Sequence, residues 1–263
     1  MTQLNPVVNQ PSLYIEGLKI TNNATTPNTK LDIAAGACRD SNNSVDMNLG
    51  NYLGQTAYPV AANSATTINF AVNGFNGLDT GTFAASTFYY VFVIADSTNK
   101  KVTGAIASLS ATAPTLPLGY DSIRLIGCCK SDGSTNLLVY YTIANGNSRY
   151  FQWDAPIAVT VTDSGTSATY SAMNFSTGVP ASNYGRINML YKWTPAAAAD
   201  TLNFTPSGAT GDYITLLGIV ASVAQQDTFS ILPLTVSSVP KVSYKRSAGT
   251  LNSVFVQSFE MIV

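Results

Sequence analysis

FYYVFVIADSTNKKVTGAIASLS, residues 88–110, is the stretch of the sequence that decides the fold. Its first eight residues are apolar without alternation and are rich in the aromatic and β-branched residues that favour strands. A polar turn, DSTNKK (96–101), follows, and a second apolar run then begins. This order predicts two antiparallel strands joined by a hairpin, with the first strand buried on both faces.

Similar strand signals continue on both sides of this hairpin, while helical signals are nearly absent. The expected strands of this first block are TTINFAV (66–72), DSIRLIGCCKS (121–131), NLLVYYTIA (136–144) and SRYFQWD (148–154). We expect the strand at 136–144 to pair with the one at 121–131, because the turn DGST separates them.

The spacing of turn residues in the sequence changes at Ala155–Pro156, where we place a domain boundary. From there about eight short strands follow at a spacing of roughly 8–12 residues, which is typical of a sandwich or jelly roll; one of them is DYITLLGIVASV (212–223). The first 60 residues are rich in Asn, Thr and Pro and carry weak strand signals. The sequence therefore predicts an all-β protein with an extended N-terminal arm (1–60), an N-terminal β domain (61–155) and a C-terminal jelly-roll-like β-sandwich (156–263).

Composition excludes several classes of function. Charged residues make up 10% of the 263 residues, far below the ~25% of ordinary soluble domains. The net charge of −1 leaves no basic excess for phosphates, so we expect no nucleic-acid partner. The chain has no histidine, which excludes Ser-His-Asp and Cys-His catalysis and HExxH zinc sites.

The three cysteines and the acidic side chains point to no cofactor. Cys38, Cys128 and Cys129 lack a CxxC spacing, and we interpret them as small buried apolar residues, with a disulfide from Cys38 as the alternative. Asp32, Asp40 and Asp46 are oxygen ligands of the kind that Ca²⁺ prefers, but they lack EF-hand spacing. We therefore interpret them as loop residues.

Two Asp-x-Gly triplets raise the question of an aspartic protease, which needs two carboxylates that share one proton. They are Asp79-Thr80-Gly81 and Asp163-Ser164-Gly165. The apolar run IAVTVT precedes Asp163, as in such proteases, but a glycine-rich turn precedes Asp79. Because Asp and Gly are also ordinary turn residues, we interpret both triplets as turns and the chain as a non-enzyme.

One cluster of side chains has the chemistry of a binding surface. Arg149, Tyr150, Phe151 and Trp153 combine aromatic rings with a guanidinium, which suits stacking on a sugar or a cation–π contact. The alternative interpretation places the same residues in the core and at a domain interface. We keep these four residues as the candidate interaction surface.

Nothing in the opening residues or the apolar runs predicts export or a membrane span. MTQLNPVVNQPSLYIEG (1–17) has neither a basic nor an apolar segment of a signal peptide. The longest apolar runs are too short to cross a bilayer. We expect a protein that is made in a cytoplasm and has no membrane partner.

The sequence resembles a group of virion proteins of tailed bacteriophages. The stretches that carry the resemblance are residues 9–41, 76–97, 112–127, 147–156 and 242–260, the last of which resembles the final strands of phage fibre and tail domains. The resemblance transfers no functional residue. It implies a structural subunit that is assembled in the host cytoplasm and ends in the virion.

What the resemblance implies about partners leaves three hypotheses open. The first is a symmetric homo-oligomer in the tail, collar or fibre-attachment region, in contact with other virion proteins. The second is a capsid decoration or head-fibre protein. The third is a receptor-binding adhesin that recognises host surface glycans through the aromatic residues near Trp153.

Overall fold

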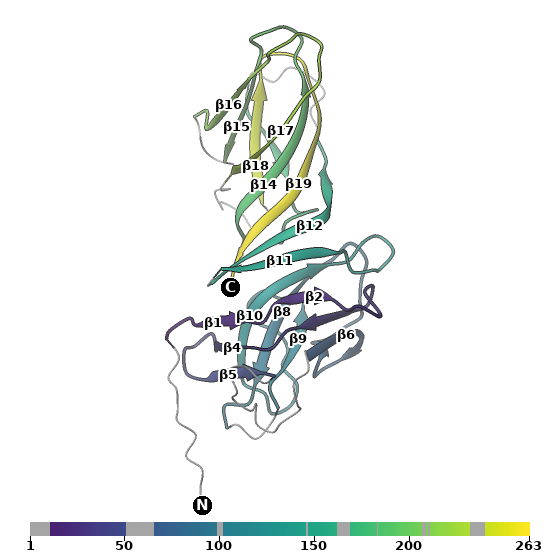
Figure 1. Cartoon of the computed structure of the whole chain (residues 1–263), viewed down its shortest axis with the longest axis vertical. Helices are drawn as coiled ribbons and strands as arrows, with labels where there is room; N and C mark the ends of the chain where they lie inside the picture. Colours follow the sequence, from purple (N-terminus) through teal and green to yellow (C-terminus); the bar gives the residue numbers. More distant parts are fainter. Residues whose placement is uncertain are drawn as a thin grey trace, which may run out of the picture. The chain divides into compact units, whose positions relative to one another are not determined.

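The structure is a computed structural model. It describes residues 11–50, 66–98, 102–145, 147–161, 169–182, 184–206, 209, 211–231 and 240–263. Every regular element in these ranges is a β-strand (Figure 1). The chain is an all-β protein with a sandwich-like fold, as the sequence predicts.

The contacts divide the chain into two compact units. Unit 1 contains residues 1–138, 142–149 and 263, and unit 2 contains residues 139–141 and 150–262. Two strands, β11 (Tyr140–Asn145) and β12 (Ser148–Val159), carry residues of both units.

Unit 1 contains a three-stranded sheet of order β1-β4-β5 and a seven-stranded sheet of order β10-β8-β9-β7-β6-β3-β2. Their bounds are β1 Ile15–Gly17, β2 Ile20–Asn22, β3 Lys30–Ile33, β4 Gly36–Arg39, β5 Asp46–Leu49, β6 Thr66–Asn73, β7 Gly77–Leu78, β8 Phe88–Ala95, β9 Gly104–Ser108 and β10 Ser122–Lys130.

Strand β8 is almost completely buried, as its unbroken apolar run predicts. Seven of its eight residues are buried. It pairs antiparallel with β9, which confirms the hairpin expected after residue 95, and antiparallel with β10 on its other side. Cys128 and Cys129 of β10 and Cys38 of β4 are free and buried, so the interpretation as buried apolar residues is confirmed.

The N-terminal part of unit 1 differs from the extended arm that we expected. Residues 15–49 form five strands, β1 to β5, that belong to the two sheets of unit 1. These strands are only three or four residues long, too short for an alternating pattern to stand out in the sequence. Residues 1–10 and 51–60 of the expected arm lie outside the described residues.

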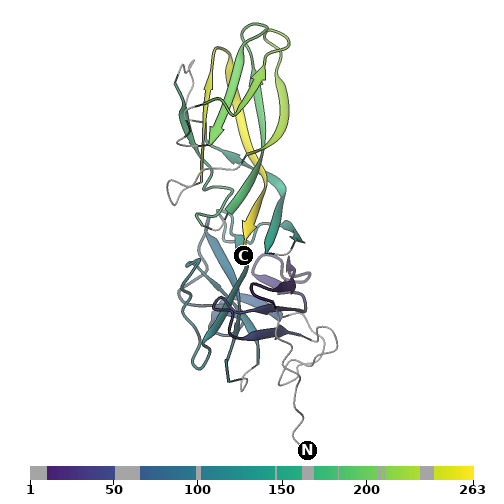
Figure 2. The same cartoon turned by 90° about the vertical axis from the view of Figure 1, so that its left-hand side faces the viewer.

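Unit 2 contains a five-stranded sheet of order β11-β12-β19-β14-β17 and a four-stranded sheet of order β13-β18-β15-β16 (Figures 1 and 2). The remaining bounds are β13 Ser171–Asn174, β14 Tyr184–Thr194, β15 Thr201–Pro206, β16 Ile214–Leu217, β17 Gln225–Ile231, β18 Lys241–Arg246 and β19 Thr250–Ile262.

The core of unit 2 forms between its two sheets. In β14, alternate residues from Ile187 to Trp193 are buried, the pattern expected for a strand with one face on a core. The side chain of Phe204 in β15 contacts the five-stranded sheet. Its ring centroid lies 4.7 Å from that of Phe229 in β17 and 6.0 Å from that of Tyr191 in β14.

Two expectations about residues 136–159 differ from the structure. The segment 136–144 does not pair along β10; it touches that strand's end through the Ser131–Leu137 bridge, and β11 pairs with β12. The expected boundary at Ala155–Pro156 lies inside β12, and the division between the units falls at residues 149 and 150. Pro156 fits this strand because it lies in an exposed stretch, where a missing backbone donor costs little.

Candidate functional site

Two aromatic residues of the candidate interaction surface, Phe151 and Trp153, lie in the core of unit 2. Phe151 and Trp153 are 1% and 2% exposed. The Phe151 ring stacks on Phe259 with centroids 5.1 Å apart, and Trp153 meets Tyr140 edge to face at 5.9 Å. The Trp153 indole N–H donates to the buried Gly178 carbonyl at 3.0 Å. Neither ring presents an open face to a sugar.

The structure does not bring the other two residues of that surface together with them. Arg149 is buried within unit 1, and burial lowers the pKa of its guanidinium. Tyr150 is half-buried, and strand alternation points it to the opposite side of β12 from Phe151. The alternative interpretation, core rather than surface, therefore describes Phe151 and Trp153.

Asp79 serves as a turn residue. Its carboxylate accepts hydrogen bonds from the Thr80 N–H at 2.7 Å, the Ser108 hydroxyl at 2.7 Å and the Thr115 N–H at 3.0 Å. Gly81 follows with a φ of 80°, in the left-handed region that glycine adopts without strain. The second triplet, Asp163-Ser164-Gly165, lies outside the described residues.

The three aspartates considered for Ca²⁺ each have partners within the chain. Asp40 is buried and accepts hydrogen bonds from Ser44 and Val45. Asp32 accepts from Asn23 and Thr67. Asp46 pairs with Arg39. The described residues contain no group of three or more His, Cys, Asp or Glu side chains that suits a metal ion.

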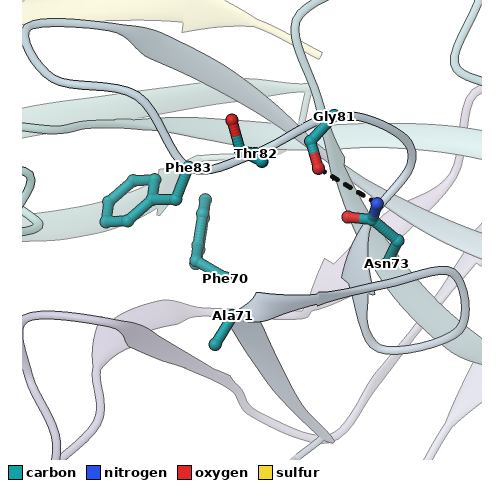
Figure 3. A pocket seen from close by; sticks show the side chains of 6 residues that line it. All are labelled: Phe70, Ala71, Asn73, Gly81, Thr82 and Phe83. Atoms are coloured by element: carbon teal, nitrogen blue, oxygen red, sulfur yellow. Dashed lines mark hydrogen bonds between the residues drawn. The ribbon is translucent and has the colours of Figure 1, made fainter.

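A shallow cavity of about 400 Å³ lies in unit 1 between the end of β6 and the loop after β7. Figure 3 shows its lining, which consists of Phe70, Ala71, Asn73, Gly81, Thr82 and Phe83. The rings of Phe70 and Phe83 lie 4.7 Å apart, and the Asn73 amide donates to the Gly81 carbonyl at 3.0 Å. The lining carries no charged side chain.

The loop over this cavity is held by one buried tyrosine. The Tyr89 hydroxyl accepts a hydrogen bond from the Ala84 N–H at 2.8 Å and donates to the Thr82 carbonyl at 3.4 Å. The Tyr89 ring also lies 5.7 Å from that of Phe83. These contacts fix the half-exposed Phe83 ring at the cavity in the free protein.

A second feature, in unit 2, is an exposed apolar segment that we define as residues 213–223, YITLLGIVASV. It covers β16 and the loop that follows. Ile219 is 80% exposed, Tyr213 69% and Leu217 60%, and Val220 and Val223 are each about half exposed. Monomeric proteins rarely expose so many neighbouring apolar side chains, and such patches usually mark interaction sites.

The backbone of the exposed apolar segment is fixed. The Gly218 N–H donates to the Asp200 carbonyl at 2.7 Å, and the Gly218 carbonyl accepts from the Ala199 N–H at 2.8 Å. The Ser222 N–H donates to the Pro195 carbonyl at 2.9 Å. The exposed side chains therefore stand on an ordered frame, so that binding a partner costs little ordering of the loop.

Sequence reasoning missed both features. An apolar run such as 213–223 predicts a buried strand, and only its lack of charges hinted at a covered surface. Phe70 and Phe83 stood in two separate stretches with no pattern that connects them. The described residues contain no helix long and apolar enough to cross a membrane.

Comparisons with known proteins identify no family for this chain. No protein-family model matches the sequence, and no curated protein matches it. Among solved structures, a carbohydrate-binding module of lichenase 5A from Cellvibrio mixtus, in complex with cellotriose, is similar over 48% of this chain and 87% of that module. The identity is 12% and the TM-score is 0.21. A likeness of this size says nothing about ligands of this chain.

Proposed function

We propose that this chain is a non-enzymatic structural subunit of a tailed-phage virion. It works as a symmetric oligomer in the tail, collar or fibre-attachment region and contacts other virion proteins. The phage origin comes from the sequence resemblance over residues 9–41, 76–97, 112–127, 147–156 and 242–260.

One structural observation supports the role of an assembled subunit: the exposed apolar segment on its fixed backbone. Ile219, Tyr213 and Leu217 expose most of their surface to water in the isolated chain. Burying each apolar side chain contributes about 1.5–3 kcal/mol. A subunit that is permanently covered by neighbours gains this free energy on assembly, which explains a surface with few charges.

Copy number in the purified virion tests the proposal, measured by quantitative mass spectrometry against the major capsid protein. A ring around one axis predicts a few to a few tens of copies, on the order of the symmetry of that axis. Hundreds of copies would move the protein to the capsid as a decoration or head-fibre protein. Absence from the particle would overturn the structural role altogether.

The cavity in unit 1 favours a second candidate, glycan recognition by an adhesin. A half-exposed Phe83 ring beside amide and hydroxyl groups, without charges, matches the needs of a neutral sugar. Phe83→Ala should abolish binding on a glycan array. Phe75→Ala, which removes a part-exposed ring outside the cavity, is the control. No binding by the wild-type protein to any host polysaccharide would exclude this candidate.

A further inference from the structure

Strand β16 is an unprotected sheet edge. It is the last strand of the order β13-β18-β15-β16, so in the described part of unit 2 no strand pairs with its outer side. Natural proteins protect such edges with charges, prolines, bulges or covering elements. The exposed apolar segment contains no Lys, Arg, Asp, Glu or Pro. An apolar edge without these protections favours pairing with another chain.

The charge of this surface is compatible with a second copy of the chain as its partner. The residue before the segment, Asp212, forms a salt bridge with Lys245. The Lys245 Nζ lies 2.7 Å from the Asp212 Oδ1 and neutralises its charge. Lys245 also lies over the Tyr170 ring, 4.8 Å from its centroid. The segment therefore offers no net charge that would select a partner of opposite sign, and it does not repel an identical surface.

We propose that β16 pairs antiparallel with β16 of a second copy of this chain, about a two-fold axis, and that the exposed apolar segments of the two copies cover each other. In an isologous contact the same residues face each other from both sides. Thr215 and Leu217, which point outward from β16, lie next to the axis. Ile219, Val220 and Val223 extend the contact beyond the strand.

This inference names the partner for the assembled subunit proposed above and rests on that proposal only for its place in a virion. The full-length protein should be a dimer, or a multiple of two, in analytical ultracentrifugation over a range of concentrations. Leu217→Lys and Ile219→Lys each place two like charges at the contact. Each should raise the dissociation constant about tenfold or more.

Leu118→Lys is the matched control, because Leu118 is 94% exposed in unit 1, outside the contact. It should leave the dissociation constant unchanged. A wild-type protein that is monomeric at all concentrations would overturn the inference. So would an oligomer that is insensitive to both Leu217→Lys and Ile219→Lys. Because these side chains are exposed, circular dichroism should show wild-type folding for all three variants.

A cysteine placed on β16 tests the geometry directly. The native cysteines are buried, so Thr215→Cys supplies one exposed thiol near the two-fold axis. Mild oxidation should give a covalent dimer on a non-reducing gel, whereas Thr112→Cys in unit 1 should give none. Equal cross-linking of the two variants, or none in Thr215→Cys, would overturn the pairing.

The two proposals fail in different ways. A chain that dimerises through β16 but is absent from virions contradicts the proposed function and leaves this inference standing. A monomeric chain that needs Leu217 for incorporation into virions contradicts this inference, because a different virion protein then covers the segment.

Discussion

Trp153 connects three parts of the core of unit 2. Its ring lies against Tyr140 of β11 and Phe259 of β19, and its N–H bonds to Gly178. Trp153→Ala removes a large buried ring, so we expect a loss of about 3–5 kcal/mol in the free energy of unfolding. Urea denaturation measures it.

Tyr213→Ala serves as the comparison for Trp153→Ala, because Tyr213 is mostly exposed. In the isolated chain it should change stability by about 0.5 kcal/mol or less. Equal losses for the two variants would contradict the assignment of Trp153 to the core and Tyr213 to the surface.

Asp40 gives a prediction for pH. Burial of its carboxyl favours the neutral form, but hydrogen bonds from Val45, Ser44 and Asn42 outweigh it, and the pKa is lowered below its ordinary value. A lowered pKa stabilises the folded state above the pKa of the unfolded chain, about 3.9, and this contribution disappears as pH falls through the folded value.

Asp40→Asn should therefore lower the free energy of unfolding by about 1–3 kcal/mol at pH 7. Its difference from wild type should shrink below about pH 4, where the Asp40 carboxyl of the unfolded chain takes up a proton, and should disappear below the lowered pKa of the folded protein. Urea titrations of both proteins between pH 7 and pH 3 measure this. A difference that is constant with pH would show that the charge of Asp40 plays no part.

For a single residue, the sequence predicts which face of a strand the side chain occupies, and no more. The burial pattern of β12 places Arg149, Phe151 and Trp153 on one side of the strand, whereas the predicted interaction surface had also included Tyr150, which lies on the other side. An aromatic residue between polar neighbours fits a binding surface and a half-buried strand equally well. Only the packing of a second sheet against the side of β12 that carries Phe151 and Trp153 distinguishes a buried strand face from a binding surface.

Among the elements, the contact of β1 with β4 depends on one glycine. A Cβ at Gly36 would lie 2.4 Å from both the Glu16 carbonyl oxygen and the Leu18 nitrogen, closer than real Cβ atoms come to such atoms. Gly36→Ala should therefore separate the two strands and destabilise unit 1 by more than about 1 kcal/mol. Thermal unfolding followed by circular dichroism measures the change.

Gly133 offers the matched substitution, because a Cβ there meets nothing within 4 Å. Gly133→Ala should be neutral or slightly stabilising, by up to about 1 kcal/mol, since alanine restricts the unfolded chain. If both alanine variants unfolded like the wild type, this result would contradict the close contact between β1 and β4 at Gly36.

The length of an element explains which ones the sequence reveals. The long strands β8 and β10 carry enough apolar residues to be predicted within one residue of their ends. The three- and four-residue strands β1 to β5 do not. They depend on turns such as the one at Asp40 and on close backbone contacts such as that at Gly36. Contacts of this kind belong to the tertiary structure and leave no pattern in the sequence.

For the whole molecule, the two units give different spectroscopic signals. Both tryptophans, Trp153 and Trp193, belong to unit 2, so tryptophan fluorescence reports on that unit, whereas far-ultraviolet circular dichroism reports on both. Because each unit has its own core, we expect Gly36→Ala to lower the midpoint of a circular dichroism transition and leave the fluorescence midpoint in place. Coincident midpoints that move together would mean that the units unfold as one.

The position of β19 in its sheet also has a consequence for synthesis. This strand lies between β12 and β14, although about fifty residues separate it from β14 in the chain. A ribosome adds about 5–20 residues per second, so β14, with the apolar faces of Tyr191 and Trp193, waits several seconds for its neighbour. Unit 1 finds nearly all its strands earlier. We therefore expect unit 1 to fold while unit 2 still exposes apolar strands, so the yield of folded protein should rise with the supply of chaperones.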